Sequence, residues 1–105
     1  MKTFHHLGLL APAIMPGETY YESLKVWATD PAQDPNRIEW LRFAPDSPLA
    51  GTPLTKMPHI SFAVDDLEKE LENQTPIVGP LAVAAGVRVA YVMVDGALTE
   101  YLEIK

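Results

Sequence analysis

The stretch PHISFAVDDLEKEL, residues 58–71, decides how this chain folds. Large apolar residues alternate in it with small or polar ones. The large ones are Ile60, Phe62 and Val64, and the others are His59, Ser61 and Ala63. This alternation predicts a strand with one packed face and one face that could line a pocket. Asp65 and Glu68 then form a capping pattern, with Asp65 at the N-cap. Leu67 and Leu71 share one stripe of the short helix expected over 65–73, so this helix can lie across a sheet face.

Three further strands are expected after this helix, near residues 77–83, 87–94 and 98–104. Asp95-Gly96 marks a hairpin between the last two. The second half therefore reads β-α-β-β-β. In the first half, strands are expected at 4–10, 25–29 and 37–44, with a possible helical turn at 18–23. We predict a single domain, residues 1–105, with a first module over 1–50, a Pro-rich connection, and a second module over 58–105.

Four residues in apolar, strand-like runs are candidate metal ligands: His6, Glu39, His59 and Glu100. Each half of the chain thus supplies one imidazole and one carboxylate, both good ligands for divalent metals. Any one of them alone is more often a packed or surface residue, and it is the repeated order that favours a site. His5 should face away from His6 and is expected to pack or lie at the surface.

Composition excludes several classes of function. The net charge of −6 argues against nucleic-acid binding. No apolar run is long enough to span a bilayer, and the first residues do not resemble a signal peptide. The sequence has no Cys, which removes disulfides, thiolate nucleophiles and Cys-ligated zinc. We therefore expect a cytoplasmic protein whose partner is a small molecule.

The segments HHLGLL, PHISFAVDDLEKEL and DGALTEYLEI resemble the vicinal oxygen chelate superfamily, which includes glyoxalase I, methylmalonyl-CoA epimerase and the bleomycin-resistance proteins. The resemblance implies an α+β fold in which paired βαβββ modules form a cupped mixed sheet around a metal. Carried over position by position, it places the ligands on the same four residues. Glu103 matches a trailing acidic residue and should point to the other face, since the pleat forbids it and Glu100 from facing one metal.

The first module departs from that family. Only PGETYYES stands where a full helix is usual, so we expect a trimmed module without it. Apolar side chains such as Leu7 and Leu9 would then lack an internal cover, which predicts a homodimer.

The resemblance implies a metal-dependent lyase or isomerase that abstracts a proton next to a carbonyl. The ion would be zinc, nickel, cobalt, manganese or iron, and Glu39 or Glu100 would be the base. The alternative is a metal-free, dimeric binding module, and a third possibility is a vestigial domain. Aromatic residues could line the cup of a binding module, although core packing is their commoner role: Trp27, Trp40, Tyr91 and Tyr101. Any of three arginines could pair with a substrate carboxylate, although surface charge is the default: Arg37, Arg42 and Arg88.

Overall fold

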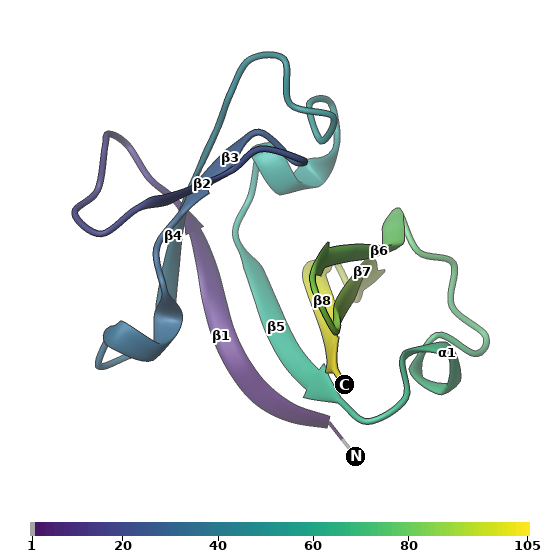
Figure 1. Ribbon diagram of the computed structural model, residues 1–105. Helices are drawn as coiled ribbons and strands as arrows, with labels where there is room; N and C mark the ends of the chain where they lie inside the picture. Colours follow the sequence, from purple (N-terminus) through teal and green to yellow (C-terminus); the bar gives the residue numbers. More distant parts are fainter. Residues whose placement is uncertain (1) are drawn as a thin grey trace. The chain divides into compact units, whose positions relative to one another are not determined.

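The structure is a computed structural model that describes residues 2–105. The described chain is mostly mixed β-sheet with one short α-helix, which agrees with the expected α+β class. The strands are β1 (Lys2–Leu10), β2 (Thr19–Tyr21), β3 (Val26–Ala28), β4 (Ile38–Phe43), β5 (His59–Val64), β6 (Val78–Ala84), β7 (Val87–Val94) and β8 (Ala97–Ile104). The helices are α1 (Leu67–Glu70) and the 3-10 turns η1 (Pro31–Gln33) and η2 (Pro53–Thr55). All can be followed in Figure 1.

The described residues divide into two compact units. The N-terminal unit is His6–Pro58, and the C-terminal unit combines residues 2–5 with His59–Lys105. The N-terminal unit has the strand order β2-β3-β4-β1, and the C-terminal unit has β5-β8-β7-β6. In each unit the first strand pairs in parallel with the last, and the remaining neighbours pair antiparallel. The two halves thus repeat one pairing scheme.

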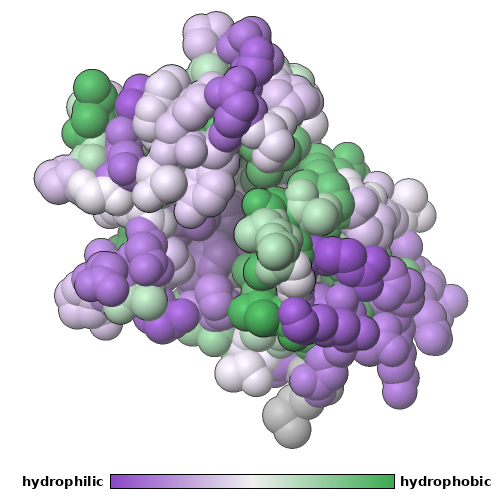
Figure 2. All heavy atoms as spheres, in the orientation of Figure 1, coloured by the Kyte–Doolittle hydropathy of each residue, from purple (hydrophilic) through white to green (hydrophobic). Residues whose placement is uncertain are grey.

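The C-terminal unit is built around the predicted strand and helix. Leu67 is fully buried in an apolar cluster that covers one face of the sheet. Phe62 and Leu71 pack against this cluster. Its buried members are Val64, Leu67, Ala90, Val92 and Tyr101. The expected stripe of Leu67 and Leu71 is therefore confirmed. The outward side of α1 is hydrophilic, and Figure 2 shows such side chains gathered over this helix. The Asp95-Gly96 hairpin is also confirmed, because both residues have positive φ, as a two-residue hairpin turn requires.

The expected cap of α1 is shifted by one residue. Asp66, not Asp65, is the N-cap, and its carboxylate accepts from the Lys69 N–H at 3.1 Å. Glu68 does not reach back to the cap, because its carboxylate pairs with Arg88. The helix is shorter than the expected range and covers four residues.

The N-terminal unit has a smaller apolar cluster of Val26, Ala28 and Leu41. The possible helical turn at 18–23 is wrong, because residues 19–21 form β2 and pair with β3. Tyr20 packs on Trp27 across this ladder with ring centroids 4.7 Å apart, a cross-strand aromatic pair that favours the strand. Among the described residues, no helix lies between β1 and β4 other than the 3-10 turn η1. No described helix is both long and apolar enough to cross a bilayer.

Candidate metal centre

In the N-terminal unit, β1 and β4 bring His6 and Glu39 together. Their parallel register places Gly8 opposite Glu39, so His6 lies two residues before the partner of Glu39 and on the same face as Gly8. The imidazole Nε2 lies 3.3 Å from Glu39 Oε1. His6 is almost fully buried, whereas the Glu39 side chain is 20% exposed.

In the C-terminal unit, β5 and β8 repeat the arrangement. Ser61 pairs with Glu100, and His59 again lies two residues before the partner of the glutamate. His59 Nε2 lies 3.9 Å from Glu100 Oε1. Both side chains are buried, with exposed fractions of 1% and 6%. In each unit one candidate histidine and one candidate glutamate therefore lie close together, through the same two-residue offset in a parallel ladder.

The spacing within each pair suits two ligands of one ion. Ligand bonds of about 2.0–2.2 Å place neighbouring ligand atoms roughly 3 to 4 Å apart. The separations of 3.3 Å and 3.9 Å lie in this range, and the longer one exceeds a hydrogen bond. Beside the second pair, the Ser61 hydroxyl is fully buried and has no hydrogen-bond partner among the described residues. A buried polar atom of this kind suits a place that a water or an ion occupies. The donor chemistry therefore fits a divalent metal.

Tyr91, which the sequence offered only as a residue that could line the cup, contacts the glutamate of the second pair. It lies directly opposite Glu100 in the β7–β8 ladder, and its hydroxyl donates to Glu100 Oε2 at 2.5 Å. Its ring meets the His59 ring edge-on at a centroid distance of 5.5 Å. The signal was present in the sequence, since counting back from the Asp95-Gly96 turn pairs Glu100 with Tyr91.

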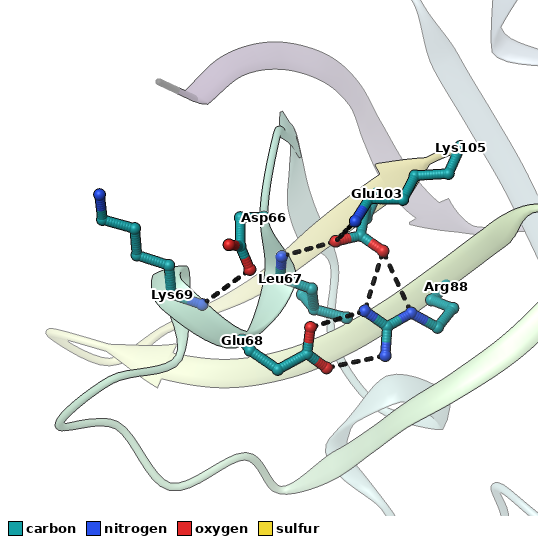
Figure 3. Close-up of polar contacts among 7 residues, drawn as sticks. All are labelled: Asp66, Leu67, Glu68, Lys69, Arg88, Glu103 and Lys105. Atoms are coloured by element: carbon teal, nitrogen blue, oxygen red, sulfur yellow. Dashed lines mark hydrogen bonds and ion pairs between the residues drawn. The ribbon is translucent and has the colours of Figure 1, made fainter.

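Glu103 belongs to a different environment. Its Oε2 accepts from the Leu67 N–H at 2.8 Å, and its Oε1 accepts from the Arg88 guanidinium at 2.9 Å, as Figure 3 shows. Arg88 also makes a two-pronged ion pair with Glu68. The expectation that Glu103 faces away from Glu100 is confirmed, because it points to the face covered by α1.

The candidate substrate-binding arginines Arg42 and Arg88 are engaged by carboxylates of this chain. Arg88 binds Glu68 and Glu103, and Arg42 forms a two-pronged pair with Glu18 at 2.9 Å for both bonds. Arg42 also stacks on Trp27 at 4.2 Å. This pairing lowers the pKa of Glu18, chiefly through the Arg42 hydrogen bonds. A substrate carboxylate would have to displace these partners.

The other three aromatic candidates lie in three different environments. Tyr101 belongs to the core beneath α1, and Trp27 contacts both Tyr20 and Arg42. Trp40 lines a shallow groove of 270 Å³ in the N-terminal unit. A second groove of the same unit, of 370 Å³, runs along the end of β4 and the loop that follows it, between Leu41 and Thr55. Trp40 therefore borders a groove of the N-terminal unit.

Comparison with known proteins supports the fold. No family model matches the sequence, and no curated protein matches it significantly. The crystal structure of hypothetical protein BH1468 from Bacillus halodurans C-125 is similar, with a TM-score of 0.74 and 20% sequence identity. The match covers 99% of this chain and 95% of that one. At this identity the likeness establishes a shared fold alone.

Proposed function

We propose that this protein is a glyoxalase- or epimerase-like, metal-dependent lyase or isomerase. It acts by removing a proton next to the carbonyl of a small oxygenated substrate. In this proposal the two units are the paired βαβββ-type modules of a cupped sheet. The short strand β2 follows β1 in the first module, where α1 follows β5 in the second.

The observation that carries the proposal is the repeated offset between histidine and glutamate. In each unit a histidine lies two residues before the ladder partner of a glutamate, and their ligand atoms are 3.3 Å and 3.9 Å apart. Two unrelated ion pairs would have no reason to share this register. We propose that His6, Glu39, His59 and Glu100 together bind one divalent ion. A bound ion would polarise the substrate carbonyl and so acidify the neighbouring C–H bond.

The residues of the chain would move the proton. The carboxylate of Glu39 or Glu100 takes the proton from the carbon next to the carbonyl, and the electron pair of the broken C–H bond moves onto the carbonyl oxygen. The same carboxylate, now an acid, returns a proton to that carbon or its neighbour. Return to the same face of that carbon gives exchange, whereas epimerisation needs the other glutamate to donate a proton to the opposite face. Return to the neighbouring carbon gives isomerisation when the hydroxyl proton of the first carbon moves to the former carbonyl oxygen. The burial of His6, His59 and Glu100 keeps bulk water from weakening these charges.

The test is deuterium uptake from heavy water by candidate 2-oxo and 2-hydroxy thioesters, followed by mass spectrometry or NMR. We expect uptake that depends on added divalent metal and disappears in Glu39→Gln or Glu100→Gln. Glu72→Gln, which alters an exposed carboxylate after α1, should leave it unchanged. A metal-loaded protein that exchanges no proton across a broad panel of substrates would contradict the enzyme proposal.

The second candidate is a metal-free, dimeric small-molecule-binding module. The two grooves of the N-terminal unit, with Trp40 bordering one of them, favour it. Ligand binding by the metal-free protein that is weakened in Trp40→Ala, together with no measurable metal affinity, would select this alternative.

A further inference from the structure

The contact between Tyr91 and Glu100 holds one oxygen of a candidate ligand. The two residues are directly opposite each other in an antiparallel ladder, and both are buried. The phenol donates to Oε2 at 2.5 Å, while Oε1 is the oxygen that lies 3.9 Å from His59 Nε2. The two carboxylate oxygens therefore have separate environments, one towards the tyrosine and one towards the histidine.

Tyr91 also restrains the histidine of the same pair. Its ring meets the His59 ring at an interplanar angle of 90°. The Tyr91 ring, packed against the His59 ring, limits rotation of the imidazole about its Cβ–Cγ bond. The Tyr91 hydroxyl limits rotation of the Glu100 carboxylate. One side chain thus orients both members of the His59–Glu100 pair.

The N-terminal unit has no equivalent tyrosine. Strand β3 ends at Ala28, and continuing its register with β4 would place Asp30 opposite Glu39. Asp30 is the N-cap of η1, where its Oδ1 accepts from the Ala32 N–H at 2.9 Å. An ionised aspartate cannot donate a hydrogen bond as a phenol does. Substitution of Tyr91 therefore removes a hydrogen bond from Glu100 and none from Glu39.

We infer that Tyr91 is a positioning residue that keeps Glu100 Oε2 hydrogen-bonded, so that Glu100 binds the divalent metal through Oε1 alone. This inference rests on the proposed metal site. Partners behind a ligand fix its orientation, and their loss typically weakens metal binding by about 10–100-fold. Without the phenol, the carboxylate can turn and offer both oxygens to the ion.

The first test compares Tyr91→Phe with Tyr101→Phe by titration with Co²⁺. Tyr101 is the matched control, since it is a buried tyrosine of the same unit whose hydroxyl meets Gln74 and not a carboxylate. We expect Tyr91→Phe to weaken Co²⁺ binding by at least tenfold. We also expect its visible absorption to become weaker, as a second carboxylate oxygen raises the coordination number. Tyr101→Phe should change neither affinity nor spectrum, even if it lowers the thermal midpoint.

The second test uses the wild-type protein and so does not depend on how the variant folds. A buried hydrogen bond from a phenol to a carboxylate should give a slowly exchanging hydroxyl proton resonance that is absent in Tyr91→Phe. Addition of Zn²⁺ should preserve this resonance if Tyr91 keeps Oε2. Its disappearance on Zn²⁺ binding would show that both oxygens turn to the metal and would overturn the inference.

The outcomes separate this inference from the proposed function. If the wild-type protein binds Co²⁺ and Tyr91→Phe has the same affinity and spectrum, the role of Tyr91 is wrong and the metal site stands. If the wild-type protein binds neither Co²⁺ nor Zn²⁺, both are wrong.

Discussion

Glu103 accepts a hydrogen bond from the backbone N–H of Leu67, which ties the first residue of α1 to the last strand of the sheet. The same carboxylate receives the Arg88 guanidinium, and Arg88 in turn holds Glu68 on the helix (Figure 3). Because α1 has four residues, it cannot be stable by itself. Its position over the core depends on Leu67 and on this set of charged contacts.

Stability should therefore fall in acid. The Leu67 N–H and then Arg88 lower the pKa of Glu103, and Arg88 lowers the pKa of Glu68 to about 2. A carboxylate whose folded-state pKa is depressed stabilises the fold above its unfolded pKa, near 4.5, and this stabilisation is lost as the pH falls towards the folded value. We predict that the thermal midpoint decreases between pH 4.5 and 2, as measured by circular dichroism.

Glu103→Gln should lower the midpoint at pH 7 and flatten its dependence on acid pH. The amide can still accept from Leu67, but it loses the charge that pairs with Arg88. Glu72→Gln is the control and should keep the wild-type profile. If the thermal midpoint of Glu103→Gln falls with acid pH as in the wild type, other carboxylates cause the loss of stability.

Two glycines with positive φ provide a matched pair for backbone sterics. Gly86 (φ +74°) lies in the β6–β7 turn, where an added Cβ would overlap the Lys105 carbonyl oxygen. At Gly96 (φ +83°) an added Cβ would have open space around it. We predict that Gly96→Ala costs about 1–2 kcal/mol through backbone strain alone. Gly86→Ala should cost more, because it also breaks the 2.7 Å bond from Lys105 N to the Gly86 carbonyl. Urea denaturation of both variants measures the difference, and equal costs would contradict the overlap.

Much of the C-terminal unit could be predicted from local sequence. His59–Val64 and the Asp95-Gly96 turn carry their structure in their own alternation and turn chemistry. The first unit was harder, because β2 is three residues long and forms through its pairing with β3. The cap of α1 was misplaced because two adjacent aspartates both suit that position, and the Glu103–Leu67 contact, 36 positions apart, satisfies the helix end from elsewhere.

The candidate site, like the fold, could be predicted in part from the sequence. The choice of two histidines and two glutamates followed from residue type and repeated order. The offset that brings each histidine to its glutamate depends on the strand register. The role of Tyr91 required the register across the hairpin, which joins it to Glu100. The engagement of Arg42 by Glu18 could not be read from the sequence, since the two residues meet across the fold and no periodic pattern links them.

Association of two copies is a further prediction. Leu7 and Leu9 are half-buried in β1, and Phe4 of the same strand is 46% exposed. We expect a homodimer at micromolar concentration, with Leu7→Ser weakening it and Ile14→Ser, in an exposed loop, leaving it intact. Sedimentation velocity measures the association. A monomer at high concentration would contradict the prediction.

Metal content tests the ligand set most directly. We predict about one divalent ion per chain after dialysis against zinc, nickel, cobalt, manganese or iron, as measured by plasma mass spectrometry. His6→Ala and His59→Ala should each reduce the affinity by more than the 10–100-fold that residues behind a ligand supply. His5→Ala is the matched control, because His5 is adjacent in sequence but points to the opposite side of β1 from the buried His6. If His59→Ala abolishes binding while His6→Ala does not, the ion is held by the C-terminal pair alone. Equal loss in both variants, with Glu39→Gln and Glu100→Gln behaving alike, is the outcome that the four-ligand proposal requires.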